Sequence, residues 1–410
     1  MTLADPGPMR IGLVVPRFHV DLLGGAELHA RWLAEHLAAA GHEVTVLTTC
    51  ALDATRWRNE LPAGPETTDA GYAVQRFPAD RRDLHEWTEL DMAIRAGREL
   101  SLEDEERWLR SGGASSAMER DLEKRGDRFD VVLGIPYMAA TTYFAAQACP
   151  ERFCVIPCLH DEPFARLGYV GRLLTRSVGA LFNCWPERDL ARRLHPRLGP
   201  SAMVGLGFEP PQAAEPDAVR EKYGIQGPFV LFIGRLELDK NVPQLLEYFV
   251  RYKERNPGPI QLVLVGHGDV TPPTRDDVHQ ITIDWRDRDS LLAAATLLIQ
   301  PSRKESLSIV TMQAWLSGLP VLAHAGSDVV RDHCLRSAGG LWFENYVEFE
   351  EMLRRLLEDG ALAGTLGRGG RAYVAREYSW PAVLGRFHDA LQSWGLPAGT
   401  HAAQPGGAQG

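Results

Sequence analysis

Short apolar runs recur along the chain and alternate with segments whose apolar residues repeat every three or four positions. The first run, at residues 10–15, is followed by apolar residues at helical spacing between positions 28 and 37. A strand buried on both faces gives the first pattern, and an amphipathic helix gives the second. A strand–helix–strand opening is therefore predicted, with its second strand at 43–47.

The same alternation continues along the chain, on both sides of a Pro- and Gly-rich segment at 196–216 that is the best linker candidate. Further strands are predicted at residues 73–77, 131–134, 152–157, 181–184, 229–233, 261–265, 281–283, 297–300 and 320–323. Helices are predicted at 186–194, 242–252, 290–295, after Glu305 and at 380–394. Two α/β series in succession predict twin Rossmann-like domains with parallel sheets.

The predicted domains are residues 9–198 and 199–379, followed by a last helix at 380–394 and a tail at 395–410. The tail consists mostly of Gly, Ala, Pro and Gln, a composition typical of disorder. Residues 80–128 carry many charges of both signs, but aromatic and aliphatic side chains are spread among them. This mixture predicts surface helices packed on the first domain.

Composition narrows the class of protein. The 410 residues are 45% hydrophobic and 24% charged, as in ordinary globular enzymes, and the net charge of −10 argues against nucleic acid as a partner. The six cysteines show no metal-type pairing, so reduced thiols are expected. No apolar run approaches the ~18 residues needed to span a bilayer, and the N-terminal residues do not read as a signal peptide. We therefore expect a soluble, cytoplasmic protein.

One basic stretch leaves peripheral contact with the inner face of the membrane open. Four arginines crowd it: Arg188, Arg192, Arg193 and Arg197. Such a cluster can meet anionic lipid. In a chain that is acidic as a whole, a solvated helix face is the alternative interpretation.

A glutamate stands where a predicted strand passes into a helix. Glu305 follows the strand at 297–300 after a short loop. Backbone N–H groups at a helix start have no partner inside the helix, and the macrodipole is positive there, so this junction favours phosphate. Glu305 would then reach a hydroxyl-rich group beside the phosphate. Phosphate next to a polyol indicates a nucleotide-sugar.

A second loop leaves the strand at 229–233 and enters the next helix with the sequence Gly234-Arg235-Leu236-Glu237-Leu238-Asp239-Lys240-Asn241. Ligands of parallel sheets bind at the carboxyl ends of the strands. Arg235 offers a planar fork to phosphate, and Lys240 a mobile point charge. On residue type alone, two solvated surface charges are the alternative.

Together the two loops resemble the donor site of the retaining glycosyltransferases of family 4, which have the GT-B fold. The resemblance rests on a G-R-x-x-x-x-K element and on an E-x(7)-E motif that begins at Glu305, and it extends over nearly the whole chain. It implies two domains facing across a cleft, with the last helix crossing back onto the N-terminal domain. It also implies that Arg235 and Lys240 neutralise the departing diphosphate and that Glu305 contacts the donor sugar.

The resemblance assigns the diphosphate to the amides that follow Glu305, which belong to Ser306, Leu307 and Ser308. At the second Glu of the motif this chain has Gln313. A carboxylate accepts hydrogen bonds from both ribose hydroxyls, whereas an amide has one acceptor and two donors. This departure bears on nucleotide affinity more than on chemistry, because the ribose lies away from the bond that breaks.

Other loops match the family less specifically. They contribute Gly24 and Gly25 of a G-G-x-E loop, His160 of an H-D pair that lines the site, and Gly266 and Gly268 of a V-G-x-G loop near the nucleotide. A simple turn and a structural histidine are the alternatives for the first two, and Asp161 and Glu162 have a capping role as their alternative. Trp285 is a weak candidate for stacking on the base, since a Trp at a strand end usually packs in a core.

The implied reaction moves a sugar from a nucleotide-diphosphate sugar to an acceptor hydroxyl with retention, in polysaccharide, glycolipid or other glycoconjugate biosynthesis. Fixed cations would do the work of a metal, so neither a metal nor a cofactor is expected. The acceptor, a carbohydrate, a glycolipid or a small molecule, is expected on the N-terminal domain near 80–128. A sugar-nucleotide epimerase or sugar-phosphate synthase of the same fold, and a non-catalytic nucleotide-sugar-binding protein, remain the alternatives.

Overall fold

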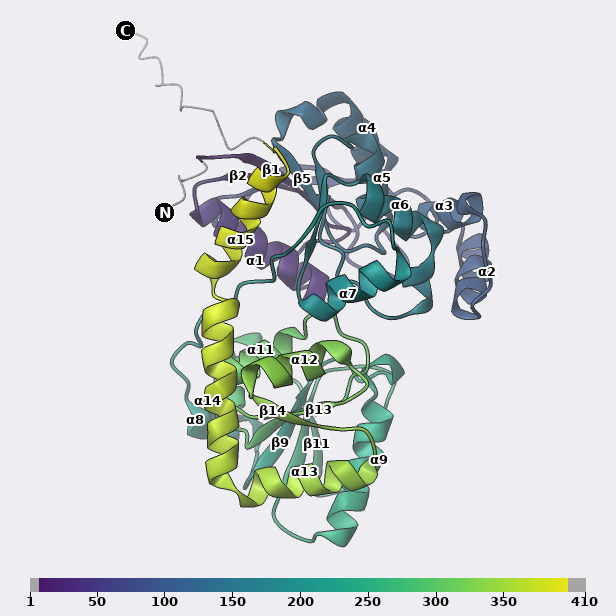
Figure 1. Cartoon of the computed structure of the whole chain (residues 1–410). Coiled ribbons are helices and arrows are strands. Elements are labelled where there is room, and N and C mark those ends of the chain that lie inside the picture. The colour runs from purple at the N-terminus through teal and green to yellow at the C-terminus, as the bar shows by residue number, and fades with distance from the viewer. Residues whose placement is uncertain (1–6, 397–410) are drawn as a thin grey trace. The chain divides into compact units, whose positions relative to one another are not determined.

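The computed structural model describes residues 7–396 of the protein. Within them the chain divides into two compact units. The first comprises the chain up to Gly207 together with the segment from Val383 onward, and the second is Phe208–Ala382. Each unit is built around its own sheet (Figure 1). No helix among the described residues is both long enough and apolar enough to cross a bilayer.

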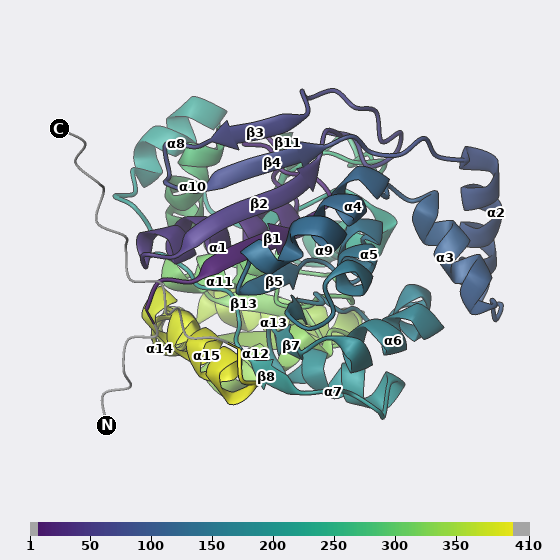
Figure 2. The same cartoon turned by 90° about the horizontal axis from the view of Figure 1, so that it is seen from above.

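The first sheet has the strand order β3-β4-β2-β1-β5-β6-β7-β8, and in Figure 2 the labels β3, β4, β2, β1 and β5 follow one another in this order from top to bottom. All neighbours are parallel except β3 and β4, which are antiparallel. The strands are β1 (Arg10–Val14), β2 (Glu43–Thr49), β3 (Gly64–Thr67), β4 (Ala73–Phe77), β5 (Val131–Gly134), β6 (Phe153–Val155), β7 (Gly179–Phe182) and β8 (Ser201–Met203). Because β1 lies in the middle and pairs with both β2 and β5, its residues Ile11 and Leu13 are fully buried.

The helices of the first unit connect these strands. They are α1 (Gly25–Ala39), α2 (Leu84–Arg95), α3 (Leu102–Arg110), α4 (Ser116–Arg125), α5 (Ala140–Ala148), α6 (Gly168–Arg176) and α7 (Trp185–Leu194), with short 3-10 turns η1 (Gly126–Arg128) and η2 (Pro163–Arg166). Helices α2, α3 and α4 each begin at a residue whose side chain accepts a backbone N–H of the first turn: Asp83, Ser101 and Ser115. The surface helices predicted for 80–128 are therefore confirmed, and they are anchored in the core by Trp108 and Leu109.

The second sheet has the order β11-β10-β9-β12-β13-β14, and all its pairs are parallel. Its strands are β9 (Phe229–Ile233), β10 (Gln261–Val265), β11 (Val278–Ile281), β12 (Leu297–Gln300), β13 (Val321–His324) and β14 (Gly340–Phe343). Its helices are α8 (Pro216–Tyr223), α9 (Val242–Arg255), α10 (Arg288–Ala294), α11 (Ile309–Leu316), α12 (Asp328–Ser337), α13 (Tyr346–Glu358) and α14 (Gly360–Glu377), with 3-10 turns η3 (Leu238–Lys240) and η4 (Trp285–Asp287). In Figure 1, α11 and α12 lie on one face of this sheet, and α9 and α13 on the other.

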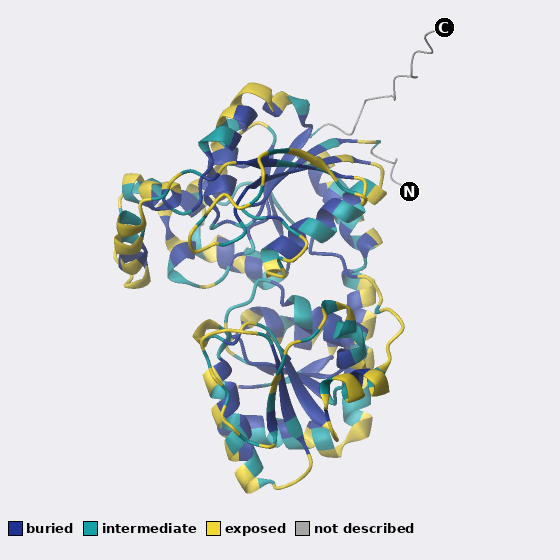
Figure 3. Ribbon diagram, turned by 180° about the vertical axis from the view of Figure 1, so that it is seen from behind, coloured by how far each residue is buried: buried dark blue, intermediate teal, exposed yellow. Residues whose placement is uncertain are grey.

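The two units thus confirm the predicted α/β class with two parallel-sheet, Rossmann-like units. Figure 3 shows the strands of both sheets as mostly buried and the outer helix faces as exposed. The core of the second unit includes Phe232, Leu264 and Ile299 from the strands, packed against Phe249 of α9 and Phe349 of α13. Such doubly covered strands read as continuous apolar runs, which is why their positions could be predicted.

Several predicted boundaries are wrong by a few residues. Strand β8 pairs with β7 inside the segment expected to be a linker, so the first unit extends beyond the predicted limit at residue 198. Strand β7 begins and ends two residues earlier than predicted, and β11 ends where the predicted strand 281–283 begins. Helix α11 begins at Ile309, later than expected after Glu305. Short strands with few apolar residues are poorly marked in the sequence, and turns can mimic them.

The last helix, α15 (Trp380–Ser393), begins in the second unit and is part of the first unit from Val383 onward. Nη2 of Arg386 donates to the carbonyl of Val204 at 2.8 Å. Nε2 of His388 lies 2.9 Å from Nε2 of His42, the residue just before β2. Most of the predicted tail, residues 397–410, lies outside the described part of the chain.

Candidate active site

The carboxyl ends of three adjacent strands in the second unit, β10, β9 and β12, carry most of the predicted donor-site residues. Arg235 and Lys240 follow β9, Gly266 and Gly268 follow β10, and Glu305 follows β12. Since parallel strands end at the same edge of a sheet, these loops lie side by side. The structure therefore brings together residues that are widely spaced in sequence.

The loops after β9 and β12 are joined by an ion pair. Nζ of Lys240 donates to Oε1 of Glu305 at 2.7 Å, and the two side chains are 26% and 10% exposed. Next to Lys240, Asn241 adopts a left-handed conformation with φ of 57°, and its Nδ2 donates to the carbonyl of Pro301 at 3.0 Å. Asn tolerates this conformation better than most residues. Asn241 is thus a residue of the site that the sequence interpretation did not single out.

Arg235 lies at the same edge but is much more exposed. Its side chain is 68% exposed, and Nη1 lies 2.7 Å from Oε2 of Glu237. This short-range pair keeps the guanidinium beside its own loop. An anionic ligand at the edge would therefore compete with Glu237 for Arg235.

Two glycines allow the loops after β9 and β10 to touch. A Cβ on Gly266 would lie 2.0 Å from the carbonyl oxygen of Gly234, and a Cβ on Gly268 would lie 2.2 Å from that of Leu236. Gly266 also has a φ of 142°, a conformation that favours glycine. The amide of Leu236 donates to the carbonyl of His267 at 2.9 Å. The glycines are therefore required by the contact between the two loops.

The start of α11 presents a row of backbone donors. Ser308 caps the helix in a left-handed conformation, with φ of 67°. Within residues 7–396 no acceptor is recorded for the N–H groups of Leu307, Ser308, Ile309 and Val310. The donors therefore reach beyond the predicted set into the first turn of the helix. Nothing in the sequence marks a left-handed Ser308, which explains why the helix start was misplaced.

Side chains hold this turn from behind. Nε2 of Gln300 donates to Oγ of Ser308 at 2.9 Å, and the same oxygen lies 2.9 Å from Oγ1 of Thr311. Gln300 Oε1 also accepts the amide of Ser302 at 3.2 Å. All four side chains are buried. The loop from β12 to α11 is thus held in place by hydrogen bonds among buried side chains.

Gln313 and Trp285 occupy different surroundings. Gln313 lies on α11, is 7% exposed, and its side chain makes no hydrogen bond within the described residues. Trp285 lies in η4 after β11, where the guanidinium carbon of Arg288 is 4.9 Å from its ring centroid. One face of this ring is therefore already occupied. Its role as a platform for the base remains a prediction.

In the first unit, the loop after β1 ends at Gly24, the N-cap of α1, and Gly25 is the first helical residue. Glu27 folds back under this turn, so that a Cβ on Gly24 would lie 2.2 Å from its Oε2. Oε1 of Glu27 accepts a hydrogen bond from Nη2 of Arg17. A side chain at position 24 would therefore displace the carboxylate of Glu27.

His160 lies in the loop after β6, at the carboxyl edge of the first sheet. Its side chain is 34% exposed, and Nδ1 is 3.5 Å from Oε1 of Glu162. Glu162 also accepts a hydrogen bond from the hydroxyl of Tyr137 at 2.8 Å. Asp161 is paired with Arg166 and Arg193. The structure thus directs Glu162 towards His160, while Asp161 is held by two arginines.

The four arginines near α7 do not form one uniform patch. Arg188 stacks on Trp185, with its guanidinium carbon 4.1 Å from the ring centroid, and Arg193 pairs with Asp161. Arg192 and Arg197 are exposed and form no ion pair within the described residues. Their contact with a membrane remains a prediction.

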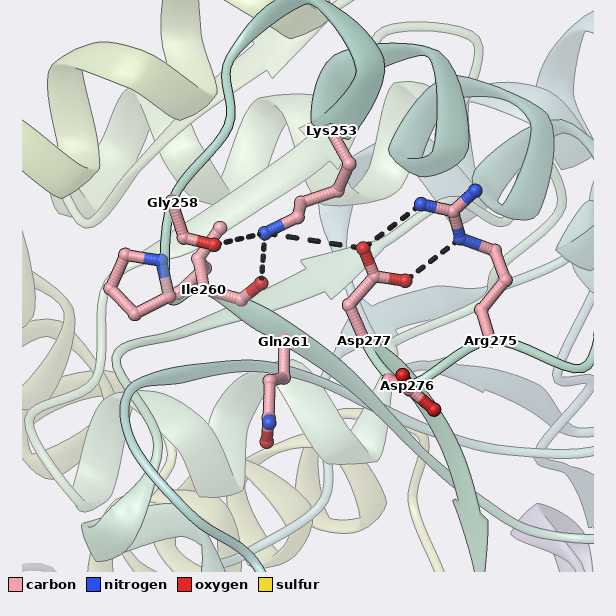
Figure 4. A pocket seen from close by; sticks show the side chains of 8 residues that line it. Lys253, Gly258, Ile260, Gln261, Arg275, Asp276 and Asp277 are labelled. Atoms are coloured by element: carbon pink, nitrogen blue, oxygen red, sulfur yellow. Dashed lines mark hydrogen bonds and ion pairs between the residues drawn. The ribbon is translucent and has the colours of Figure 1, made fainter.

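A cavity of about 450 Å³ lies at the opposite edge of the second sheet, at the amino ends of β10 and β11 (Figure 4). Three of its charged side chains already have partners: Arg275 Nε donates to Asp277 at 2.8 Å, and Lys253 donates to the carbonyl of Ile260 at 3.0 Å. Ligands of parallel sheets bind at the other edge. This cavity is therefore not the candidate donor site.

Both the second unit and the whole chain resemble known proteins. The sequence profile of the family described as "Glycosyl transferases group 1" matches residues 227–359, the part of the second unit that holds Arg235 through Gln313. A GDP-mannose-dependent monoacylated alpha-(1-6)-phosphatidylinositol monomannoside mannosyltransferase from Corynebacterium glutamicum is 29% identical, over 47% of this chain and 55% of that protein. A glycogen synthase from Mycobacterium tuberculosis is 24% identical over 92% of each chain.

Among solved structures, sucrose-phosphate synthase from Thermosynechococcus elongatus shares the fold, with a TM-score of 0.71 and 18% identity over 94% of this chain and 99% of that one. Its likeness and the twin parallel sheets confirm the predicted GT-B fold. The match over residues 227–359, the glycosyltransferase relatives and this fold together identify the chain as a GT-B glycosyltransferase.

Proposed function

We propose that this glycosyltransferase belongs to family 4 and moves a sugar, with retention, from a nucleotide-diphosphate sugar to an acceptor hydroxyl. The diphosphate binds at the carboxyl edge of the second sheet. The acceptor, a carbohydrate, glycolipid or other small molecule, binds at the first unit. The named mannosyltransferase relative, which uses GDP-mannose and a lipid-linked acceptor, supports this choice of substrate class.

The observation that carries the proposal is the pairing of Lys240 with Glu305 beside the orphan amides at the start of α11. Four successive N–H donors and a lysine form a strongly anion-attracting edge. A carboxylate directly next to them would repel a lone phosphate. It suits a ligand that carries hydroxyls next to its phosphate, which is the chemistry of a nucleotide-sugar.

The proposed mechanism assigns each group a task. The amides of Leu307 to Val310 bind the phosphates, and Glu305 accepts hydrogen bonds from sugar hydroxyls. As the bond between the anomeric carbon and the phosphate oxygen stretches, negative charge grows on the diphosphate. Lys240 and Arg235 stabilise this charge more strongly than that of the ground state, which lowers the barrier. The acceptor oxygen bonds to the anomeric carbon on the face that the phosphate leaves, and its proton passes to the leaving phosphate. The configuration of the anomeric carbon is therefore retained.

The test is to incubate the protein with a panel of UDP-, GDP- and ADP-sugars and to measure the release of nucleoside diphosphate. For the donor that is turned over, NMR of the first product gives its anomeric configuration. We expect slow donor hydrolysis and the configuration of the donor in the product. Turnover with inversion would overturn the retaining mechanism. If donors bind but no nucleoside diphosphate is released from any of them, the protein is a nucleotide-sugar-binding protein and not an enzyme.

A further inference from the structure

A fully buried carboxyl group lies beneath the His160 loop. Glu187, on the first turn of α7, is 0% exposed. Its Oε1 accepts the amide of Leu159 at 2.7 Å, and its Oε2 accepts the amide of Asn183 at 2.6 Å. Leu159 directly precedes His160, and Asn183 follows β7. One side chain therefore ties together the loops at the carboxyl ends of two neighbouring strands, β6 and β7.

The bond to Asn183 is an ordinary feature of helix starts. A glutamate at the third helical position often folds back onto the backbone N–H groups just before the helix, and this stabilises the helix alone. The bond to Leu159 is different, because it spans 28 residues and its donor lies outside α7, so it does not satisfy an N–H group at the start of that helix. Burial raises the pKa of Glu187 to about 8. The ionised side chain is therefore less stable in this buried position than in water.

The loop that Glu187 holds is strained. Cys158 has a φ of 53°, a left-handed conformation that a residue with a side chain adopts only when its surroundings impose it. Nδ2 of Asn183 lies 3.6 Å from Sγ of Cys158, and Nδ1 of His29 on α1 lies 4.0 Å from the same sulfur. The next amide, that of Leu159, goes to Glu187. The turn into His160 is therefore fixed from below at two consecutive residues.

We propose that Glu187 is a positioning residue for His160: by binding the Leu159 amide it holds the turn through Cys158 and so sets the place of the His160 ring at the edge of the first sheet. The proposal rests on the proposed function and on the role that the family resemblance implies for His160, which is to line the active site. Glu187 itself does not reach the substrates. It acts only through the backbone of the loop.

The first unit offers a matched control. Glu105 on α3 is also buried, and its two oxygens accept the amides of Gly168 at 2.9 Å and Tyr169 at 2.7 Å, at the start of α6. The number of bonds and the burial are comparable, whereas the bonds of Glu105 span 63 and 64 residues and those of Glu187 span 28 and 4. No predicted site residue adjoins these amides. A change from Glu to Gln at either position removes one acceptor for a buried N–H.

The experiment compares kcat and donor KM of the wild type, Glu187→Gln, Glu105→Gln and His160→Ala, and of the double variant of Glu187 and His160. The substrate is whichever of UDP-glucose, GDP-mannose or ADP-glucose the wild type turns over fastest. We expect Glu187→Gln to lower kcat by about 10- to 100-fold through misplacement of His160. Donor KM should stay within about twofold, because the donor-binding loops belong to the second unit. Because Glu105 lies within residues 80–128, where the acceptor is expected, this control is compared by donor hydrolysis without acceptor. There Glu105→Gln should keep the wild-type rate, while its thermal midpoint falls as much as that of Glu187→Gln.

The double variant separates positioning from general stability. If Glu187 acts through His160, Glu187→Gln should cause no further loss of kcat in the His160→Ala background, because the two effects are then strongly coupled. An equal loss in both backgrounds would overturn the proposal. So would a loss in Glu105→Gln that matches that of Glu187→Gln.

Cys158→Gly serves if Glu187→Gln does not fold. Glycine adopts the left-handed turn without strain, so the fold is kept while the hold on the turn loosens. We expect a smaller fall in kcat, again absent in the His160→Ala background, and a fall that persists in that background would overturn the proposal. A wild type that turns over no donor would refute the proposed function itself. If the wild type is active but Glu187→Gln and Glu105→Gln have the same kcat, only the role of Glu187 is refuted.

Discussion

Lys240 and Glu305 are 65 residues apart in sequence, yet Nζ of one lies 2.7 Å from Oε1 of the other. They meet because β9 and β12 are neighbours in the sheet and each side chain follows the carboxyl end of its strand. Both are largely shielded from solvent. In the proposed function, the pair aligns a cation and a hydrogen-bond acceptor before any substrate arrives, which is the preorganisation that transition-state stabilisation requires.

Removal of Lys240 should therefore be costly. For Lys240→Ala we expect a loss of about 1.5–3 kcal/mol of transition-state stabilisation, or roughly 10- to 150-fold in kcat/KM. Steady-state kinetics with the best donor measure it. Arg255→Ala, which breaks an ion pair with Glu350 between α9 and α13, is the control and should have normal kinetics. Equal kinetics for Lys240→Ala and the wild type would contradict the assignment.

Arg235 should bind a diphosphate more tightly once its neighbour stops competing for it. Glu237→Gln removes the carboxylate 2.7 Å from Arg235 and leaves the loop otherwise unchanged. Because exposed ion pairs are worth about 0–1 kcal/mol, we expect the dissociation constant of the nucleoside diphosphate to fall by at most roughly fivefold. Calorimetry at low and high salt measures this gain, which salt should reduce. Arg235→Ala should show no response to the same change, and a gain that persists there would refute the explanation.

Gln313 should respond to its replacement by Glu. If it lies at the ribose, a carboxylate restores two acceptors, and nucleoside diphosphate binding should tighten by about 0.5–1.5 kcal/mol, as for one hydrogen bond. The turnover number should change little, because this contact is the same in the ground and transition states. Calorimetry on both variants decides.

The repulsion between a new carboxylate and the diphosphate acts in the opposite direction, and Lys240 and Arg235 screen it. The position is only 7% exposed, so the thermal midpoint of Gln313→Glu without ligand must be measured alongside binding. Unchanged or weaker binding by a folded variant would mean that Gln313 does not hold the ribose.

Stability should depend on pH through Glu187. Its pKa is raised from 4.5 to about 8 by burial, so the folded state retains a proton that the unfolded state loses. Below pH 4.5 both states are protonated, and between pH 4.5 and about 8 the unfolded state gains by ionising. The free energy of unfolding of the wild type, measured relative to Glu187→Gln by urea denaturation, should therefore fall across this range and level off above it. A difference that is constant with pH would contradict the raised pKa.

Catalysis should not need a metal ion, since Arg235, Lys240 and the amides at the start of α11 supply the positive charge. Activity should survive EDTA at full level. If EDTA abolishes it, and Mn²⁺ or Mg²⁺ but not Ca²⁺ restores it, the proposed charge stabilisation is wrong. Binding of the nucleoside diphosphate, measured with and without EDTA, shows whether the effect lies in binding or in turnover.

The sequence indicates the central strands well, because β9, β10 and β12 are buried on both faces and appear as unbroken apolar runs. Their carboxyl ends place Arg235, Lys240 and Glu305 at one edge by topology alone. The strand β3 could not be predicted, because its residues Gly64–Thr67 are Gly, Pro, Glu and Thr and are mostly exposed. They therefore show no apolar pattern. Strand β8 has only three residues.

Other parts of the site depend on contacts that no local pattern shows. The start of α11 depends on a left-handed Ser308, a conformation set by Gln300 and Thr311 from behind. The link from Glu187 to Leu159 joins two loops that are adjacent only in the folded sheet. Because a glutamate near a helix start is common, the sequence gives no sign that Glu187 also accepts the amide of Leu159.

The contact between Gly266 and Gly234 has a consequence for any attempt to redesign the donor site. There is no room for a Cβ between them, and the amide of Leu236 donates to the carbonyl of His267. The loops after β9 and β10 are therefore packed tightly against each other and depend on each other for their conformation. A loop grafted after one strand alone would collide with the other or lose its support. If this edge binds the donor, as proposed, its specificity can be changed only by exchanging both loops together, and variation in one loop has to be matched by variation in the other.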